Sequence, residues 1–228
     1  MPALTDAQRD QFVTEGYVFP VPVLTPAEVA KYLAHYQEFR EWTKDKLASV
    51  PPKDRFKFVH ETHLVLPWIH ELVSHPAIVS ALQSLLGPDI VCWNTVWFAK
   101  DPKDAAFVSW HQDGTYWNFK PTVGITAWIA LTPSNPPNGC VRVIPRTQGA
   151  MMAYRETFAD DNLLSRGQEI ENIDASKAVD LILQPGQMSL HDFWMVHGSN
   201  ANNSGEPRIG LAVRYTRPDV QGPRFLVS

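Results

Sequence analysis

Cysteine is scarce in this chain, with only two in 228 residues. Both of them, Cys92 and Cys140, lie within apolar runs of the sequence. Two such thiols are typical of reduced positions in a core, and they exclude the multiple cross-links of a small disulfide-stapled domain. We therefore expect a fold that is held together by its hydrophobic core.

Long hydrophobic runs are also missing. No apolar stretch reaches the roughly 20 residues that a helix needs to cross a bilayer. Residues 1–6 lack the basic and apolar regions with which a secretory signal begins. These absences predict a cytoplasmic protein without a membrane partner.

The chain has no large excess of acidic or basic residues, since its formal net charge is −4 and its pI is about 6.0. A chain of this kind lacks the basic surface that binds nucleic acid. Hydrophobic residues make up 44% and charged residues 19%, which is a globular balance. Without internal repeats, the length favours one domain spanning residues 1–228. Nothing in the sequence indicates an oligomeric state.

The first 88 residues have a helical pattern. Thr5 and Thr25 are each followed three positions later by Gln or Glu, which is the capping-box signature of a helix start. The elements predicted are a helix after Thr5, a strand at 16–19, a helix from Thr25 to about Trp42, a loop over 44–58 and a helix at 67–86.

Short β-strands separated by turn signals are predicted after residue 88, at 89–99, 124–131, 141–144, 179–183, 188–191 and 209–216. In the strand 124–131, Ile125, Ala127, Ile129 and Leu131 share one face, and Thr126, Trp128 and Ala130 share the other. Helices followed by many strands favour a mainly β fold with a helical cover, an antiparallel sandwich or jelly roll. Residues 1–88 would then pack on a β core formed by 89–228. The polar segment 151–176 is expected to be either a lid or binding loop, or a flexible insertion.

The stretch Trp110–Trp117 holds the residues with the clearest chemistry. His111 and Asp113 are two positions apart, so on an extended strand both side chains would point to the same face. An imidazole and a carboxylate that converge supply two ligands of the 2-His-1-carboxylate triad, which binds Fe(II) and leaves coordination positions open. The pair alone is a weak signal, because His-x-Asp is common by chance.

A third ligand is expected from a histidine near the end of the chain. His191 and His197 compete for this role, and the Gly-Ser that follows His197 and its spacing to Arg208 favour His197. Arg208 begins an apolar strand, where a buried guanidinium requires an anion such as a carboxylate. The chain therefore offers two histidines, one aspartate and an arginine suited to a carboxylate-bearing cosubstrate.

With these residues the chain resembles the phytanoyl-CoA dioxygenase family of Fe(II)/2-oxoglutarate-dependent oxygenases, from Gly16 to Tyr215. The shared motifs are His111-Gln112-Asp113, Trp128, Asn138-Gly139-Cys140 with Ile144-Pro145, Pro185-Gly186, and His197-Gly198-Ser199 with Asn202, Ser204 and Arg208. One departure is Pro145-Arg146-Thr147-Gln148, where the family often has Pro-Gly-Ser-His. We interpret it as loop variation on the substrate side.

The resemblance implies a double-stranded β-helix of the cupin-like kind, with Fe(II), 2-oxoglutarate and O2 as cofactors. It implies that His111, Asp113 and His197 are the iron ligands and the catalytic residues. For 2-oxoglutarate it implies Arg208 at the distal carboxylate, Ser199 assisting it, Trp128 nearby and Lys57 in contact with the same molecule.

The implied reaction is hydroxylation of an unactivated C–H bond of a small molecule, coupled to decarboxylation of 2-oxoglutarate to succinate and CO2. Relatives that halogenate have a small residue in place of Asp113, so its carboxylate favours hydroxylation. Arg142 and Arg214 either face outward or bind an acidic substrate. The alternatives are a jelly-roll protein that binds metal or a small molecule without turnover, and a hydrolase with Zn(II) at the same ligands.

Overall fold

Two antiparallel β-sheets form the centre of the computed structural model, which describes residues 4–50, 58–117, 119–157, 161–164 and 167–222. In spatial order, the larger sheet holds β1 (Tyr17–Pro22), β9 (Gln187–Asp192), β4 (Ile125–Ala130), β11 (Arg208–Thr216) and β2 (Val91–Lys100). The smaller sheet holds β3 (Val108–His111), β10 (His197–Ser199), β5 (Val141–Val143) and β8 (Val179–Asp180). The predicted mainly β architecture is confirmed.

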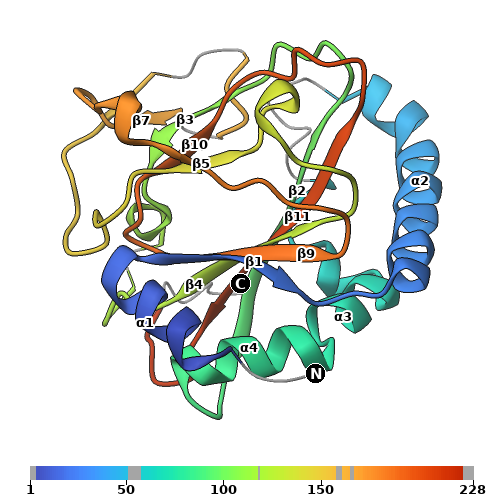
Figure 1. The fold of residues 1–228 in the computed structure, drawn as a ribbon. Coiled ribbons are helices and arrows are strands. Elements are labelled where there is room, and N and C mark those ends of the chain that lie inside the picture. Colours follow the sequence, from blue (N-terminus) through green and yellow to red (C-terminus); the bar gives the residue numbers. More distant parts are fainter. Residues whose placement is uncertain (1–3, 51–57, 118, 158–160, 165–166, 223–228) are drawn as a thin grey trace, which may run out of the picture.

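The helices cover the larger sheet. They are α1 (Asp6–Glu15), α2 (Pro26–Ala48), α3 (Pro67–Val73) and α4 (Pro76–Leu86), with short 3-10 turns η2 (Thr62–Leu64), η3 (Asp113–Thr115), η4 (Pro136–Asn138) and η5 (Ala175–Lys177). Figure 1 shows the smaller sheet above the larger one, and α3 and α4 on the opposite side of the larger sheet. The two sheets therefore face each other, and the helices close the outer face of one of them.

Both predicted capping boxes are present at the starts of α1 and α2, where Thr5 and Thr25 accept a hydrogen bond from the backbone N–H three residues on. Two helix boundaries were predicted wrongly. The second helix continues to Ala48, so part of the expected loop over 44–58 is helical. The expected helix 67–86 is two helices, because the ring of Pro76 excludes a helical backbone at the preceding residue and His75 has ψ 129°.

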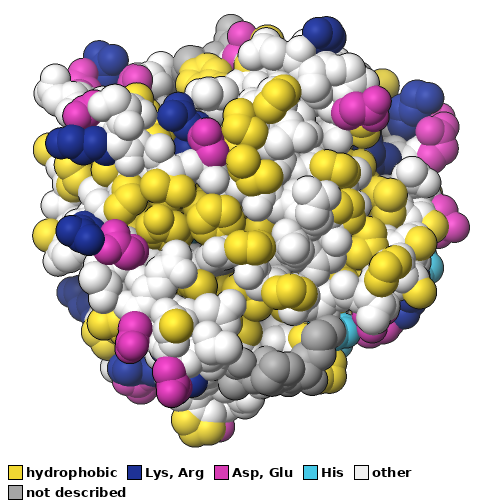
Figure 2. All heavy atoms as spheres, in the orientation of Figure 1, with side chains coloured by type: hydrophobic (Ala, Val, Ile, Leu, Met, Phe, Trp, Pro, Cys, Tyr) yellow, Lys and Arg dark blue, Asp and Glu magenta, His cyan; other side chains and the backbone are white. Residues whose placement is uncertain are grey.

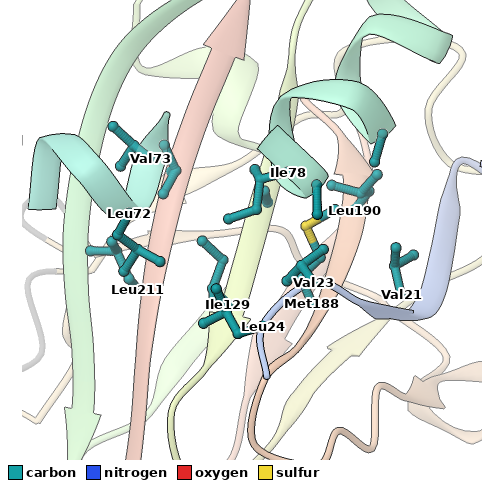
Figure 3. Close-up of a cluster of buried hydrophobic side chains, with 14 of the residues drawn as sticks. Val21, Val23, Leu24, Leu72, Val73, Ile78, Ile129, Met188, Leu190 and Leu211 are labelled. Carbon is teal, nitrogen blue, oxygen red and sulfur yellow. The ribbon is translucent and has the colours of Figure 1, made fainter. Parts of the chain in front are cut away.

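The alternating face pattern predicted for β4 is confirmed. Ile125, Ala127, Ile129 and Leu131 pack against the helices, whereas Trp128 and Ala130 point between the sheets. β11 alternates in the same way. Figure 3 shows the resulting helix–sheet cluster, in which α3 and α4 contribute Leu72, Val73 and Ile78 to side chains from β4, β9 and β11, including Ile129, Met188, Leu190 and Leu211. This cluster buries one face of the larger sheet against the helices. The other face of the same sheet lines the interior between the two sheets.

The polar segment 151–176 contains a two-stranded hairpin, β6 (Arg155–Glu156) and β7 (Gln168–Glu169). Just after β7, the backbone N–H of Ile170 donates to the carbonyl of Trp110 in β3 at 2.7 Å. The segment therefore lies beside β3, the strand that ends at His111, but its two strands form a separate sheet.

The strand β1 comes from the predicted helical part of the chain, yet it pairs with β9 at the edge of the larger sheet.

The interpretation of residues 1–228 as one domain stays a prediction. So does the cytoplasmic location, although none of the helices in the described part has the length and apolarity needed to span a membrane. Figure 2 shows acidic and basic side chains interspersed on one face of the molecule, without a continuous basic stripe there.

Candidate metal centre and cosubstrate site

Two histidines meet where β3 pairs with β10. His111 is the last residue of β3 and His197 is the first of β10, and they are direct partners in the antiparallel register. Their ring centroids are 4.1 Å apart, and both side chains are buried. The pairing of two strands that are distant in sequence therefore brings the rings together, as the expected metal site requires.

Asp113 reaches the same point by a different route from the one predicted. Only His111 lies on the strand, whereas Asp113 begins the 3-10 turn η3. The expectation that both side chains share a strand face was therefore wrong, because β3 ends at the residue that pairs with His197. Instead, the turn brings the Asp113 Oδ1 atom to within 3.6 Å of the His111 Nε2 atom.

Each histidine ring is oriented by a backbone carbonyl two residues earlier. The His111 Nδ1 atom lies 2.9 Å from the carbonyl oxygen of Ser109, and the His197 Nδ1 atom lies 2.9 Å from that of Met195. With a proton on Nδ1, each ring presents the lone pair of Nε2. Burial lowers the pKa of His197 well below its usual range, as does nearby His111, so its ring is neutral. Neutral imidazoles with a free Nε2 are the form that binds a metal.

The donor atoms of His111, Asp113 and His197 all lie within 4.8 Å of one another, so the three residues form a group that could hold a metal ion. The Nε2 atom of His111 is buried and has no hydrogen-bond partner among the described residues. A buried nitrogen of this kind is costly unless something binds it. One carboxylate and two imidazoles are also the donor set of non-heme Fe(II) centres.

The Asp113 carboxylate is held by two residues from the larger sheet. The Thr126 hydroxyl donates to Oδ2 at 2.6 Å. The Arg214 guanidinium donates to Oδ2 at 3.3 Å and to Oδ1 at 3.2 Å. Burial would raise the pKa of Asp113, but the positive charge of Arg214 opposes it, and that pKa lies well below its usual range. The carboxylate is therefore ionised and fixed in one orientation.

His191, the competitor of His197, lies beside the centre. Its ring centroid is 4.2 Å from that of His197, and its Nε2 atom is 4.0 Å from the Asp113 Oδ2 atom. Burial lowers the pKa of His191 to about 4, so this ring is also neutral. It packs against the ligand group from β9 but does not belong to the set whose donor atoms converge.

Arg208 lies in the interior at the start of β11, next to a cavity that His111, His197 and Ser199 also line. Its side chain is almost completely buried, and burial lowers its pKa to about 10. Its Nη1 atom donates to the carbonyl of Gly139, and the guanidinium lies 5.2 Å from the ring centroid of Trp128. Its Nε atom has no hydrogen-bond partner and no carboxylate pairs with it in the described part of the chain, so this buried charge fits an anionic ligand.

Ser199 lies at the same end of the cavity, and its hydroxyl accepts a hydrogen bond of 2.8 Å from Lys100 Nζ. Lys100 is fully buried on β2, directly across the ladder from Arg208. Burial lowers the pKa of Lys100 to about 6, and the charge of Arg208 acts in the same direction. Lys57, which was also expected to contact 2-oxoglutarate, lies outside the described residues.

Sequence reasoning assigned no role to Lys100 or Thr126, and for Arg214 it left open whether the side chain faces outward or binds an acidic substrate. A signal for Arg214 is present, since Arg208, Gly210, Ala212 and Arg214 alternate along β11 and therefore share the inward face. Thr126 shares the inward face of β4 with Trp128 in the same way. The sequence does not show which strands pair, and it is this pairing that places β4 and β11 beside Asp113.

A family profile described as "Phytanoyl-CoA dioxygenase (PhyH)" matches residues 12–210, a range that contains the three candidate ligands and Arg208. The chain belongs to this family. Membership confirms the predicted resemblance and, with the buried donor group, the predicted cofactor set of Fe(II), 2-oxoglutarate and O2.

Solved structures confirm the double-stranded β-helix, or jelly-roll, prediction. The chain is 32% identical to a non-heme monooxygenase, ThoJ, with a TM-score of 0.81 over 94% of this chain and 79% of that one. It also shares its fold with the epimerase SnoN in complex with Fe3+, alpha ketoglutarate and nogalamycin RO. For SnoN the TM-score is 0.74 and the identity 21%, over 96% of this chain and 86% of that one.

Curated relatives are more distant in sequence. A probable phytanoyl-CoA dioxygenase of Caenorhabditis elegans is 24% identical over 163 residues, which are 68% of this chain and 52% of that protein. The chain spans about half the length of the curated phytanoyl-CoA dioxygenases that it matches, between 43% and 52% for the first three. The substrate of those proteins is therefore not carried over to this one.

Proposed function

We propose that this protein is an Fe(II)/2-oxoglutarate-dependent oxygenase that hydroxylates an unactivated C–H bond of a small molecule, with decarboxylation of 2-oxoglutarate to succinate and CO2. The observation that carries the proposal is that two buried features with unsatisfied polar groups lie in the same interior. One is the buried His–Asp–His group, in which the Nε2 atom of His111 has no hydrogen-bond partner among the described residues. The other is Arg208, a buried cation without a carboxylate partner among the described residues.

In this proposal His111, Asp113 and His197 hold the iron, and Arg208 receives the distal carboxylate of 2-oxoglutarate. When bound, Fe(II) and 2-oxoglutarate together supply the oxidising chemistry through O2. The Nδ1 hydrogen bonds of the two histidines orient their Nε2 atoms toward the metal position. Ser199 and Trp128 line the same cavity as Arg208, where they would orient the cosubstrate and exclude water.

Hydroxylation is proposed in preference to halogenation because Asp113 supplies a carboxylate at the third ligand position. That carboxylate is ionised, buried and held by Thr126 and Arg214, so the position is filled by the protein. The fold also carries an epimerase, SnoN, so the architecture alone does not decide the reaction. Hydroxylation adds one oxygen atom to the substrate, whereas epimerisation leaves its composition unchanged.

The test is to reconstitute the purified chain anaerobically with Fe(II) and 2-oxoglutarate, and then to measure succinate, O2 uptake and bound metal. We expect one Fe(II) per chain and succinate formation that substrate accelerates, with an atom from labelled O2 in the product. His197→Ala should lose iron and succinate together, and His70→Ala, an exposed histidine on α3, should change neither. Zn(II) in place of Fe(II), or iron and 2-oxoglutarate binding without succinate across a substrate panel, would contradict the proposal.

A further inference from the structure

Asp113 lines a second cavity, which has a volume of about 220 Å³. Its walls combine aromatic and aliphatic side chains with a few polar groups, and they include Phe98, Trp117, Leu163, Asn94, Asp113 and Arg214. None of Arg208, Ser199 and Trp128 lines it. The two cavities share Phe98 and Arg214 as lining residues, and Asp113 lines only the second.

Arg214 lines both cavities, whereas Arg208 lines only the first. The Arg214 side chain is 6% exposed, and its guanidinium lies 5.8 Å from the ring centroid of Phe98 and 5.7 Å from that of Trp117. Two of its nitrogens, Nε and Nη2, contact the Asp113 carboxylate. The third, Nη1, is buried and has no hydrogen-bond partner among the described residues. A buried donor without a partner is costly, so this position favours a ligand that accepts a hydrogen bond.

The two arginines stand at opposite ends of one strand face. Along β11 the inward positions are Arg208, Gly210, Ala212 and Arg214, so two small residues separate two cations. Six residues of strand place their Cα atoms roughly 20 Å apart. The Trp128 ring packs against Gly210, Arg208 lines only the first cavity, and Arg214 lines both.

Metal binding changes the charge balance around Arg214. In the structure its partner is the carboxylate of Asp113. A divalent metal on Asp113 would draw on that same negative charge, which leaves the buried guanidinium incompletely neutralised. His60 also lines the cavity, and burial lowers its pKa to about 4, as does the charge of Arg214, so it adds no positive charge. Glu61 lines the cavity as well but is exposed to solvent.

We propose that this second cavity takes a substrate that carries a carboxylate, and that Arg214 binds this carboxylate while the rest of the molecule packs against Phe98, Trp117 and Leu163. The inference rests on the proposed oxygenase function and names its substrate class, an organic acid with an apolar body. The same strand would then hold the acid groups of both reactants, with the cosubstrate on Arg208 and the substrate on Arg214.

The experiment measures binding without turnover. The full chain is held anaerobically with Fe(II) and N-oxalylglycine, an unreactive diacid that mimics 2-oxoglutarate and occupies the Arg208 end. Phenylacetate, 3-phenylpropionate and hexanoate are then titrated in parallel with their methyl esters by calorimetry. For at least one pair we expect the acid to bind about tenfold or more tightly than its ester, the size of one charge-assisted hydrogen bond.

Arg214→Gln should remove this preference for the acid over its ester, whereas Arg214→Lys should keep part of it. The acid-to-ester ratio is internal to each variant, so a general loss of iron or stability affects both ligands equally. Arg142→Gln is the matched control, because Arg142 is paired with Asp180 at the edge of the smaller sheet and lines neither cavity.

Three outcomes would overturn the proposal. The first is that no acid binds the unaltered protein more tightly than its ester. The second is that Arg214→Gln keeps the ratio, or that Arg142→Gln loses it equally. The third is that Arg214→Gln weakens N-oxalylglycine instead, which would assign Arg214 to the cosubstrate. None of these results depends on succinate formation, so the proposed reaction can fail while acid recognition stands, or the reverse.

Discussion

At the scale of single residues, the candidate site is defined by groups that lack a partner. The Nε2 atom of His111 and the Nη1 atom of Arg214 are buried and unpartnered among the described residues, and Arg208 has no carboxylate there. The backbone of a β core satisfies its own hydrogen bonds, so such side chains stand out. The triad positions could be predicted from the order and spacing of His111, Asp113 and His197. The contacts to Asp113 could not, because they come from strands that are far apart in sequence.

The hydroxyl of Thr126 fixes the Asp113 carboxylate, which predicts an effect on metal affinity. Thr126→Val keeps the side-chain shape but removes the 2.6 Å hydrogen bond to Oδ2. Because such outer contacts orient metal ligands, we expect Fe(II) affinity to fall about 10- to 100-fold in anaerobic titrations. Thr43→Val, which alters a buried threonine on α2 that bonds to its own helix, should leave iron affinity unchanged. Equal iron affinity in both variants would show that Thr126 does not orient the ligand.

Lys100 predicts a pH dependence of stability. Burial lowers its pKa to about 6 from the model-compound value of 10.5. Between these values the unfolded chain binds more protons at this residue than the folded chain does, so its contribution to stability increases as the pH rises. Relative to Lys100→Met, the unfolding free energy of the unaltered protein should increase by about 1.4 kcal/mol per pH unit from about pH 7 to about pH 9.

Urea unfolding at several pH values measures this difference. Lys44→Met serves as the control, because the Lys44 side chain is 70% exposed on α2. That variant should track the unaltered protein at every pH. Parallel stability curves for Lys100→Met and the unaltered protein would contradict the prediction.

At the scale of elements, β11 connects the helix–sheet cluster with the site. Its outward residues, Ile209, Leu211, Val213 and Tyr215, pack in the helix–sheet cluster, and its inward residues face the cavities. The alternation of β4 was predicted from the sequence, as were the capping boxes of α1 and α2, whereas the facing of Arg214 on β11 was left open. The break between α3 and α4 was signalled by Pro76 but was not predicted, because the apolar periodicity continues through it.

Gly210 is required on the inward face of β11 by close packing. A Cβ atom at this position would lie 2.0 Å from the Trp128 ring, so Gly210→Ala must displace the indole. We expect a loss of about 1–3 kcal/mol in unfolding free energy and weaker 2-oxoglutarate binding, since Trp128 lines the Arg208 cavity. Gly205→Ala is the matched control, because a Cβ there meets no atom within 4 Å. The expectation fails if the two variants unfold and bind 2-oxoglutarate alike.

At the scale of the whole molecule, different hydrophobic clusters stabilise the two faces of the larger sheet. The helix–sheet cluster lies on one face of the larger sheet, and a smaller cluster that includes Trp128, Val143 and Met195 lies between the sheets. Because the metal ligands belong to the inner side, damage to the helix–sheet cluster should reduce stability more than it reduces metal affinity. The two properties can therefore be separated by mutation.

Leu72→Ala tests this separation. Leu72 is fully buried on α3 within the helix–sheet cluster, so its truncation should cost about 2–5 kcal/mol in unfolding free energy. Fe(II) affinity of the folded protein should stay within about twofold. Leu64→Ala alters a side chain that is 70% exposed and should change stability by less than about 0.5 kcal/mol. Denaturant unfolding and anaerobic iron titration would measure both, and a large loss of iron affinity in Leu72→Ala would disprove the separation.

The sequence by itself determined the local features of this protein: helix starts, strand alternation, and the order in which ligand-type residues occur. These depend on neighbours within a few positions, where periodicity and capping act directly. Only the tertiary structure decided that η3 rather than a strand places Asp113, and that Thr126, Lys100 and Arg214 surround the site. Their positions follow from the pairing of β10 with β3 and of β4 with β11. Such pairing depends on packing between distant segments, and no local pattern specifies it.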